Sequence, residues 1–343
     1  MTLDERKRRV LRVIIDDYIN TAEPIGSRTI VRRHELGVSP ATIRNEMADL
    51  EILGYLEQPH TSAGRIPSDK GYRFYVDCLM GPQQLNQHEI ALIKQWYDTR
   101  VNEVDEVFQE TAKLLSRVSR NVSLVLAPQI AQCAFKYLQF LPFDGQKALA
   151  VVVTDSGLVE NKLMEIPEGI EMDDLRRIAE VINNQLSGLR FDQIRSELLL
   201  DIQQQVIKHP AFFRSTTDML RRTLTVQRGE KVFLGGATQL LGHPEFKDVE
   251  KFKLILGMLE EEQLLYDILT PSATDEVNVT IGEENKFSGI QQCSMVTATY
   301  TIQGQTIGTL AVLGPTRMEY AKMVSMMQFM TVQMSEVLKK FGL

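Results

Sequence analysis

The strongest constraint on the fold is a run of short helix patterns in the first 55 residues, each ended by proline or glycine. Val10, Ile14 and Tyr18 recur four residues apart, which predicts a helix over residues 4–19 with one buried face. Pro24 disfavours helical backbone in the residue before it. The first helix therefore ends before Pro24.

Two further helices are predicted after short turns. Ser27 is a favoured N-cap residue, so a second helix is expected over residues 28–36, with Gly37 ending it. Ser39 followed by Pro40 is a strong signal for the start of a third helix. Gly54 stops this helix, and its inner face carries Ile43, Met47 and Leu50.

A hairpin pattern follows the third helix. Residues 56–58 look extended, residues 60–64 are rich in turn formers, and residues 65–67 return, before a fourth helix over residues 69–79. The order helix, helix, helix, hairpin is typical of a winged helix-turn-helix. We therefore predict a DNA-binding domain over residues 1–78.

The third helix of such a domain lies in the major groove and contacts bases near its N-terminal end. Arginine suits guanine and asparagine suits adenine, each through two hydrogen bonds. Arg65 suits the adjacent backbone or minor groove, and the polar residues around Ser27 suit phosphate oxygens. Taken singly, each residue is an ordinary surface residue, and only the joint pattern favours DNA binding. The predicted DNA-binding residues are Ser27, Arg28, Thr29, Ser39, Ala41, Thr42, Arg44, Asn45, His60 and Arg65.

Charge is distributed unevenly along the chain. Residues 1–76 hold 12 basic and 11 acidic residues, whereas the remainder holds 26 basic and 34 acidic residues, within a total net charge of −7. The basic residues of the first segment also cluster, which favours a polyanionic partner more than net charge alone does. For the run at residues 6–9 alone, a solvated helix face is the preferred interpretation.

The chain length of 343 residues indicates two or three domains in all. The residues after the first domain alternate between strand and helix patterns. A helical stretch over residues 86–120 predicts a core helix or a linker helix between protomers, and we assign residues 79–102 as a linker helix. Strands are expected at residues 123–127, 135–141, 147–153 and 159–166, then helices over 173–225 and 249–265, strands at 277–281, 293–302 and 306–313, and a last helix over 318–341. The economical interpretation is one α+β domain interrupted by a helical insertion; two separate α+β domains are the alternative.

Signs of catalysis or metal binding are weak. No two of the five histidines lie at metal-ligand spacing, and no nucleophile elbow, phosphate-binding loop or dinucleotide-binding glycine motif occurs. We therefore expect no enzyme activity, no metal and no cofactor. Three distant cysteines exclude a disulfide framework, and no apolar run is long enough to cross a bilayer, so we expect a cytoplasmic protein without a membrane partner.

Several uninterrupted stretches carry a family resemblance. They read GSRT at residues 26–29, LGVSPATIRNEMADL at 36–50, GYL at 54–56, QPHTSAGRIP at 58–67 and DKGYRFYVD at 69–77, with FLGGA at 233–237 and HPEF at 243–246 further on. Together these resemble the heat-inducible transcription repressor family HrcA of bacteria. The central helical block agrees with the family only in pattern.

The resemblance implies a repressor that binds an inverted-repeat operator upstream of chaperone operons. It implies a GAF-like α+β domain in two pieces, residues 103–166 and 236–343, split by an inserted dimerisation domain at residues 167–235. It also implies that the chaperonin GroEL assists the active fold, so that repression fails when heat-denatured proteins occupy the chaperonin.

An inverted repeat needs two DNA-binding domains related by a two-fold axis, so we expect a homodimer. The apolar stripe of Leu198, Ile202 and Val206 is the predicted seam. Two other functions stay open: a repressor whose GAF-like domain senses a small metabolite, and an enzyme tethered to DNA by its N-terminal domain.

Overall fold

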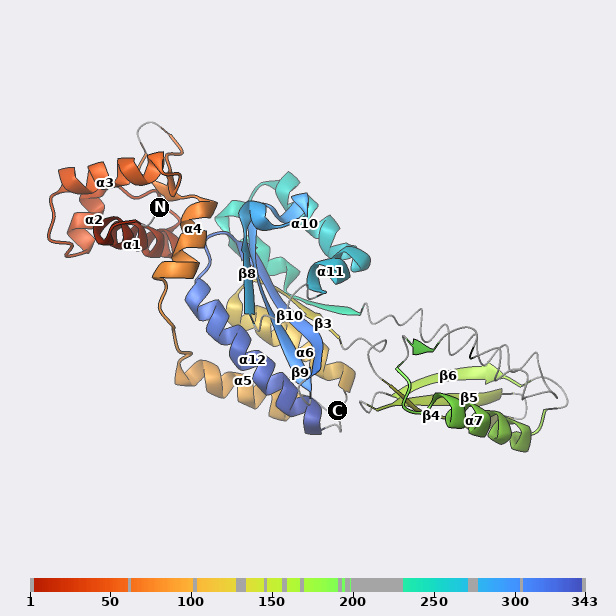
Figure 1. Ribbon diagram of the computed structural model, residues 1–343. Helices are drawn as coiled ribbons and strands as arrows, with labels where there is room; N and C mark the ends of the chain where they lie inside the picture. The colour runs from red at the N-terminus through yellow and green to blue at the C-terminus, as the bar shows by residue number, and fades with distance from the viewer. Residues whose placement is uncertain are drawn as a thin grey trace. The chain divides into compact units, whose positions relative to one another are not determined.

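The computed structural model is a mixed α+β protein that divides into two units (Figure 1). The first unit comprises Met1–Val125, Phe233–Tyr300 and Thr309–Gln333, and the second comprises Leu126–Val232, Thr301–Gly308 and Met334–Leu343. The structure describes residues 3–60, 63–100, 104–127, 134–144, 147–155, 159–166, 170–190, 193–194, 198, 231–270, 277–302 and 305–340.

Residues 3–79, here called the head segment, contain the predicted succession of helices and a hairpin. The helices are α1 (Glu5–Thr21), α2 (Ser27–Arg33), α3 (Pro40–Ile52) and α4 (Asp69–Phe74), which continues as a π-helical turn, η1 (Tyr75–Leu79). The strands β1 (Leu56–Glu57) and β2 (Ile66–Pro67) pair antiparallel, with Leu56 opposite Pro67. Their order along the chain is the one that the sequence predicts.

Capping and apolar burial explain where these helices form. The Asp4 side chain accepts a hydrogen bond from the Lys7 backbone amide at 2.8 Å and caps α1. The Ser39 hydroxyl does the same for Thr42 at 3.1 Å and caps α3, with Pro40 in its first turn. The core between the helices is formed by Val10, Leu11, Ile14, Ile15, Ile30, Ile43 and Leu50, all fully or almost fully buried. Burial of each such side chain contributes about 1.5–3 kcal/mol to folding.

The second helix is shorter than the sequence predicts. It begins at Ser27 and ends at Arg33, not Leu36, and Gly26 rather than Ser27 occupies the N-cap position. At its end, His34 has extended backbone, and its Nε2 lies 3.0 Å from an Asp17 carboxylate oxygen on α1. This contact accompanies the exit of the chain from the helix before Gly37 is reached.

The hairpin lies against the start of α2. Ile25 and Arg65 exchange two backbone hydrogen bonds, at 3.0 and 2.9 Å. A Cβ atom at Gly64 would lie 2.4 Å from the carbonyl carbon of Ile25, so only glycine permits this approach.

A five-stranded sheet forms the centre of the region after the head segment. Its strand order is β7 (Val232–Gly235), β3 (Val122–Leu126), β10 (Gln305–Pro315), β9 (Cys293–Ile302) and β8 (Val277–Ile281). Strand β7 is not among the strands expected from the sequence. A Cβ at Gly235 would lie 2.3 Å from the Ala112 carbonyl oxygen, so this glycine permits close packing of the strand.

Five helices and four short 3₁₀ turns are described in the same region of the chain as this sheet. They are α5 (Gln87–Arg100), α6 (Val104–Ser119), α10 (Val249–Glu260), α11 (Glu262–Leu269) and α12 (Tyr320–Lys340), with short 3₁₀ turns η4 (Ala237–Gly242), η5 (Pro244–Phe246), η6 (Gly282–Glu284) and η7 (Ser288–Ile290). The helical stretch expected over 86–120 contains two helices, and the single helix expected over 249–265 is also two helices. The methionines of the last helix region, Met318, Met323, Met326, Met327, Met330 and Met334, are all buried.

The second unit contains a separate antiparallel sheet. Strands β4 (Phe135–Asp144), β5 (Lys147–Thr154) and β6 (Val159–Glu165) pair in sequence order, and α7 (Met172–Leu186) packs on them. Asn183 on α7 accepts a hydrogen bond from the Leu138 amide at 2.7 Å and donates one to the Leu138 carbonyl at 3.0 Å.

The expected boundary of the split domain is therefore wrong. Residues 135–166 do not join the five-stranded sheet. Consecutive hairpins instead pair β4, β5 and β6 with one another, and their apolar face is buried against α7. Leu198 is half-buried against this cluster, whereas Ile202 and Val206 lie outside the described residues. None of the helices in the described part of the chain is both long and apolar enough to span a bilayer.

Candidate nucleic-acid interface

The outer face of α3 carries the polar residues that the sequence singles out. Ala41, Arg44 and Asn45 are exposed, whereas Ile43 and Met47 on the opposite face are buried in the head segment. Thr42 is half-buried, and its hydroxyl lies 3.0 Å from that of the N-cap residue Ser39, which is itself exposed. This end of α3 thus presents a long cation, an amide and two hydroxyls within two turns.

The arginines of the head segment fall into two groups. Arg28 and Arg32 on α2 and Arg44 on α3 are exposed, and none has an ionic partner among the described residues. By contrast, Arg6 lies 3.5 Å from Glu46, and Arg33 lies 3.4 Å from Asp17. Unpaired cations can bind an external anion without first breaking an internal contact, and this holds for the arginines of α2 and α3 and also for the exposed Arg9 on α1.

The other predicted residues differ in how accessible they are. Ser27 is 8% exposed, so its side chain offers little surface to a ligand. Thr29, two residues further along α2, is half-buried. His60 is exposed at the end of the described hairpin, next to residues 61–62, which the structure does not describe. Arg28 is therefore the most accessible of the predicted residues at the start of α2.

Arg65 differs most from its predicted role. Its Nε donates a hydrogen bond to Glu51 on α3 at 2.9 Å, and its Nη2 lies 2.7 Å from the same oxygen. The Arg65 side chain is only 19% exposed. These contacts favour a role in bracing the hairpin against α3 over a free phosphate contact.

The C-terminal end of the head segment is attached to the five-stranded sheet. Arg73 on α4 donates to both carboxylate oxygens of Glu284, at 2.8 and 2.5 Å, and to the Val279 carbonyl at 2.5 Å. Partial burial opposes ionisation of Glu284, but these hydrogen bonds outweigh it and lower the pKa of Glu284. Asp69, also on α4, accepts a hydrogen bond from the Glu283 amide at 3.1 Å.

Two further features fix this attachment. Gly282 has a φ of +55°, and a Cβ there would lie 1.6 Å from an Asp69 carboxylate oxygen, so glycine is required on two grounds. Arg317 pairs with Glu245 and donates to the Ile19 carbonyl of α1 at 3.2 Å. No sequence pattern could have predicted these contacts, because their partners lie 72 to 298 residues apart.

The described residues contain no group of three or more histidine, cysteine or acidic side chains that could hold a metal ion.

Comparison with known proteins decides the family. Residues 105–324 match the model of the HrcA protein C-terminal domain. The heat-inducible transcription repressor HrcA of Pelotomaculum thermopropionicum is 48% identical over 99% of this chain and 98% of its own length. The chain belongs to the HrcA family. The HrcA repressor of Moorella thermoacetica is 42% identical over 99% of each chain.

Membership in HrcA confirms the family resemblance of these sequence stretches, and the match extends over almost the whole chain. HrcA is a family of heat-inducible transcription repressors and not of enzymes. A crystal structure described as that of a hypothetical protein has the same fold. It covers 99% of this chain and 100% of its own, with a TM-score of 0.62 and 23% identity.

Proposed function

We propose that the head segment is a winged helix-turn-helix that binds double-stranded DNA through α2 and α3. The observation that carries the proposal is the exposure of Arg44 and Asn45 near the N-terminus of α3 and of Arg28 on the preceding helix. Arg44 would contact guanine and Asn45 adenine in the major groove. Hydroxyls of Ser39 and Thr42, with the methyl group of Ala41, would complete the base-facing surface.

Residues around this surface would position it on the phosphate backbone. Arg28 and Thr29 at the start of α2 and His60 on the hairpin suit phosphate oxygens, because such contacts fix register without reading sequence. Because its side chain is buried, Ser27 would contact phosphate only through its backbone N–H group at the start of α2. Arg65 would hold the hairpin against α3 through Glu51.

We further propose that the protein acts as a homodimer on an inverted-repeat operator upstream of chaperone operons. In the second unit, Leu141, Leu149 and Leu163 are paired across the three strands and so share one face. Leu141 is 40% and Leu163 42% exposed, although Leu138 and Phe140 of β4 are buried on the face toward α7. An exposed apolar row of this kind suits an interface between copies.

This row supports the second unit as the dimerisation domain. The stripe of Leu198, Ile202 and Val206 remains part of the proposed seam, with Leu198 already half-buried in its own unit. The sheet of five strands with its helices would be the GAF-like domain. Leu163→Lys should yield a monomer by sedimentation equilibrium, whereas Lys162→Ala on the same strand should remain a dimer. A dimeric Leu163→Lys variant would move the seam away from this face.

Loss of active fold, rather than release of a ligand, would end repression on heating, with the chaperonin GroEL restoring the active dimer. Opened apolar surface in a multidomain dimer aggregates faster than it refolds, which makes inactivation irreversible and dependent on protein concentration. Operator DNA should slow inactivation because it binds only the folded protein.

The direct test is a footprint of the full chain on the chaperone promoters of its own organism, before and after heating. We expect protection of an inverted repeat, loss of protection after heating, and recovery only with chaperonin and ATP. Absence of any protected repeat would contradict operator binding. Rapid full recovery without chaperonin would contradict the proposed temperature control.

A further inference from the structure

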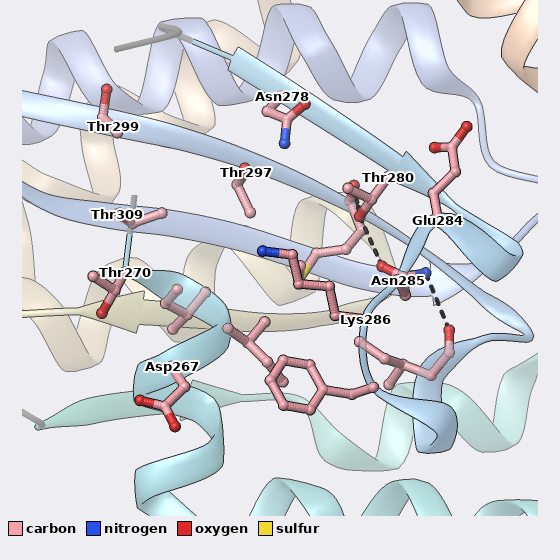
Figure 2. A pocket seen from close by; sticks show the side chains of 15 residues that line it. Asp267, Thr270, Asn278, Thr280, Glu284, Asn285, Lys286, Thr297, Thr299 and Thr309 are labelled. Carbon is pink, nitrogen blue, oxygen red and sulfur yellow. Dashed lines mark hydrogen bonds between the residues drawn. The ribbon is translucent and has the colours of Figure 1, made fainter. Parts of the chain in front are cut away.

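A cavity of about 230 Å³ lies between the five-stranded sheet, α11 and the loop after β8 (Figure 2). One wall is the sheet face that carries Thr297 and Thr299 of β9 and Thr309 of β10. The opposite side is formed by the apolar side chains of Leu269, Phe287 and Ile290 and by the long side chain of Lys286.

Threonine side chains line this face of the sheet. The alternate residues of β9, such as Val296 and Ala298, are buried and apolar, as the core side of a sheet requires. The Thr309 hydroxyl is completely buried, in a residue 2% exposed, and has no hydrogen-bond partner in the described structure. An unsatisfied buried hydroxyl costs about 1–3 kcal/mol, so a bound polar group would offset that cost.

The cavity lining carries one ammonium group, that of Lys286, and two carboxylates, those of Glu284 and Asp267. Glu284 at the rim is already held by the Arg73 guanidinium, and Asp267 is exposed and accepts a hydrogen bond from Gln263 at 3.3 Å. Lys286 has no hydrogen-bond or ionic partner among the residues that the structure describes, and its side chain extends over the threonine-bearing face (Figure 2). The cavity therefore offers a free ammonium group to a ligand.

The backbone around Lys286 is held rigidly. The buried side chain of Asn285 donates hydrogen bonds to the carbonyls of Gly282, Ile290 and Cys293, at 3.0, 3.1 and 2.9 Å, and accepts one from Thr280 at 2.8 Å. A side chain with four such contacts fixes the backbone of the loop, whereas the Lys286 side chain is exposed and would be ordered on binding.

We infer that this cavity binds a small organic monocarboxylate, with its carboxylate at Lys286 and the Thr309 hydroxyl and its apolar body against Phe287 and Ile290. A volume of about 230 Å³ is below that of pockets for drug-sized ligands, which limits the ligand to a short chain or a single ring. Oxygen acceptors on the ligand would satisfy Thr309, and the ammonium group would neutralise the negative charge.

Isothermal titration calorimetry on the full chain, without DNA, tests this inference independently of the proposed repressor function. The probes are benzoate and hexanoate, with benzamide and hexanamide as neutral controls at matched ionic strength. We expect at least one carboxylate to bind with a Kd of about 1 mM or tighter. Its amide should bind at least about tenfold more weakly, because the amide lacks the charge.

Variants separate a ligand site from a structural one. Lys286→Met should weaken carboxylate binding at least about tenfold, whereas Lys251→Met, an exposed lysine on α10 outside the cavity, should leave it unchanged. Thr309→Val should weaken binding without lowering the thermal unfolding temperature, because it removes an unsatisfied hydroxyl at almost constant volume. No saturable binding of either carboxylate, equal binding of the amides, or full binding by Lys286→Met would overturn the inference.

Discussion

The two ends of the head segment use arginine in opposite ways. On α2 and α3, Arg28 and Arg44 are exposed and have no ionic partner among the described residues. On α4, Arg73 makes two hydrogen bonds to Glu284 and one to a backbone carbonyl of the sheet. A guanidinium that is already bound must lose those contacts before it can bind phosphate. We therefore expect the arginines without an internal partner, rather than all arginines of the head segment, to contact DNA.

The largest effect should come from the base-facing residues of α3. Arg44→Ala and Asn45→Ala should each weaken binding to the footprinted operator by about 1–3 kcal/mol, because each removes a two-pronged contact to a base. Binding to random DNA should weaken much less. Competition titration measures both affinities. Equal losses on operator and random DNA would leave these residues only a phosphate contact.

A smaller effect is expected at the attachment of α4. Arg73→Ala should lower the free energy of unfolding by about 1 kcal/mol, because a partly exposed ion pair and one carbonyl hydrogen bond are lost. Urea denaturation measures this change. Arg12→Ala, which removes an exposed pair with Asp16 on α1, is the matched control and should change little. A larger loss for Arg12→Ala than for Arg73→Ala would contradict the importance assigned to the attachment.

The smallest effect on DNA binding should be that of Arg65→Ala. Because Glu51 holds the guanidinium, we expect the salt dependence of DNA binding to stay the same while stability falls by roughly 0.5–1 kcal/mol. Titration across a series of salt concentrations distinguishes the two roles. A decrease in the log–log slope by about one unit would show that Arg65 leaves Glu51 to contact a phosphate after all.

Local signals made the head segment predictable from sequence. Ser39 and Pro40 mark the start of α3 and Gly54 follows its end, because capping and backbone conformation depend on residues a few positions apart. The end of α2 was missed for the opposite reason. His34 has left the helix and contacts Asp17, which lies on another helix and is not apparent from the local sequence.

Long-range pairing explains the remaining errors. Strands β4 to β6 were each recognised, yet their sheet was assigned to the wrong domain, because alternation within a strand does not say which strand lies next to it. The functional residues show the same division between local signals, which the sequence carries, and tertiary contacts, which it does not. The sequence indicated Arg44 and Asn45 by their place on α3, but the pairing of Arg65 with Glu51 and the free ammonium of Lys286 depend on tertiary contacts.

The most direct test of the central claim compares two arginines of one helix. Arg28 at the start of α2 has no ionic partner in the part of the chain that the structure describes, whereas Arg33 at its end lies 3.4 Å from Asp17. The measurement is the log–log slope of operator affinity against salt concentration for the full chain, Arg28→Ala and Arg33→Ala. We predict that Arg28→Ala reduces the slope by about one unit and that Arg33→Ala leaves it unchanged. Equal slopes for all three proteins, or a reduction by Arg33→Ala alone, would contradict the claim that unpaired arginines on α2 and α3 bind DNA.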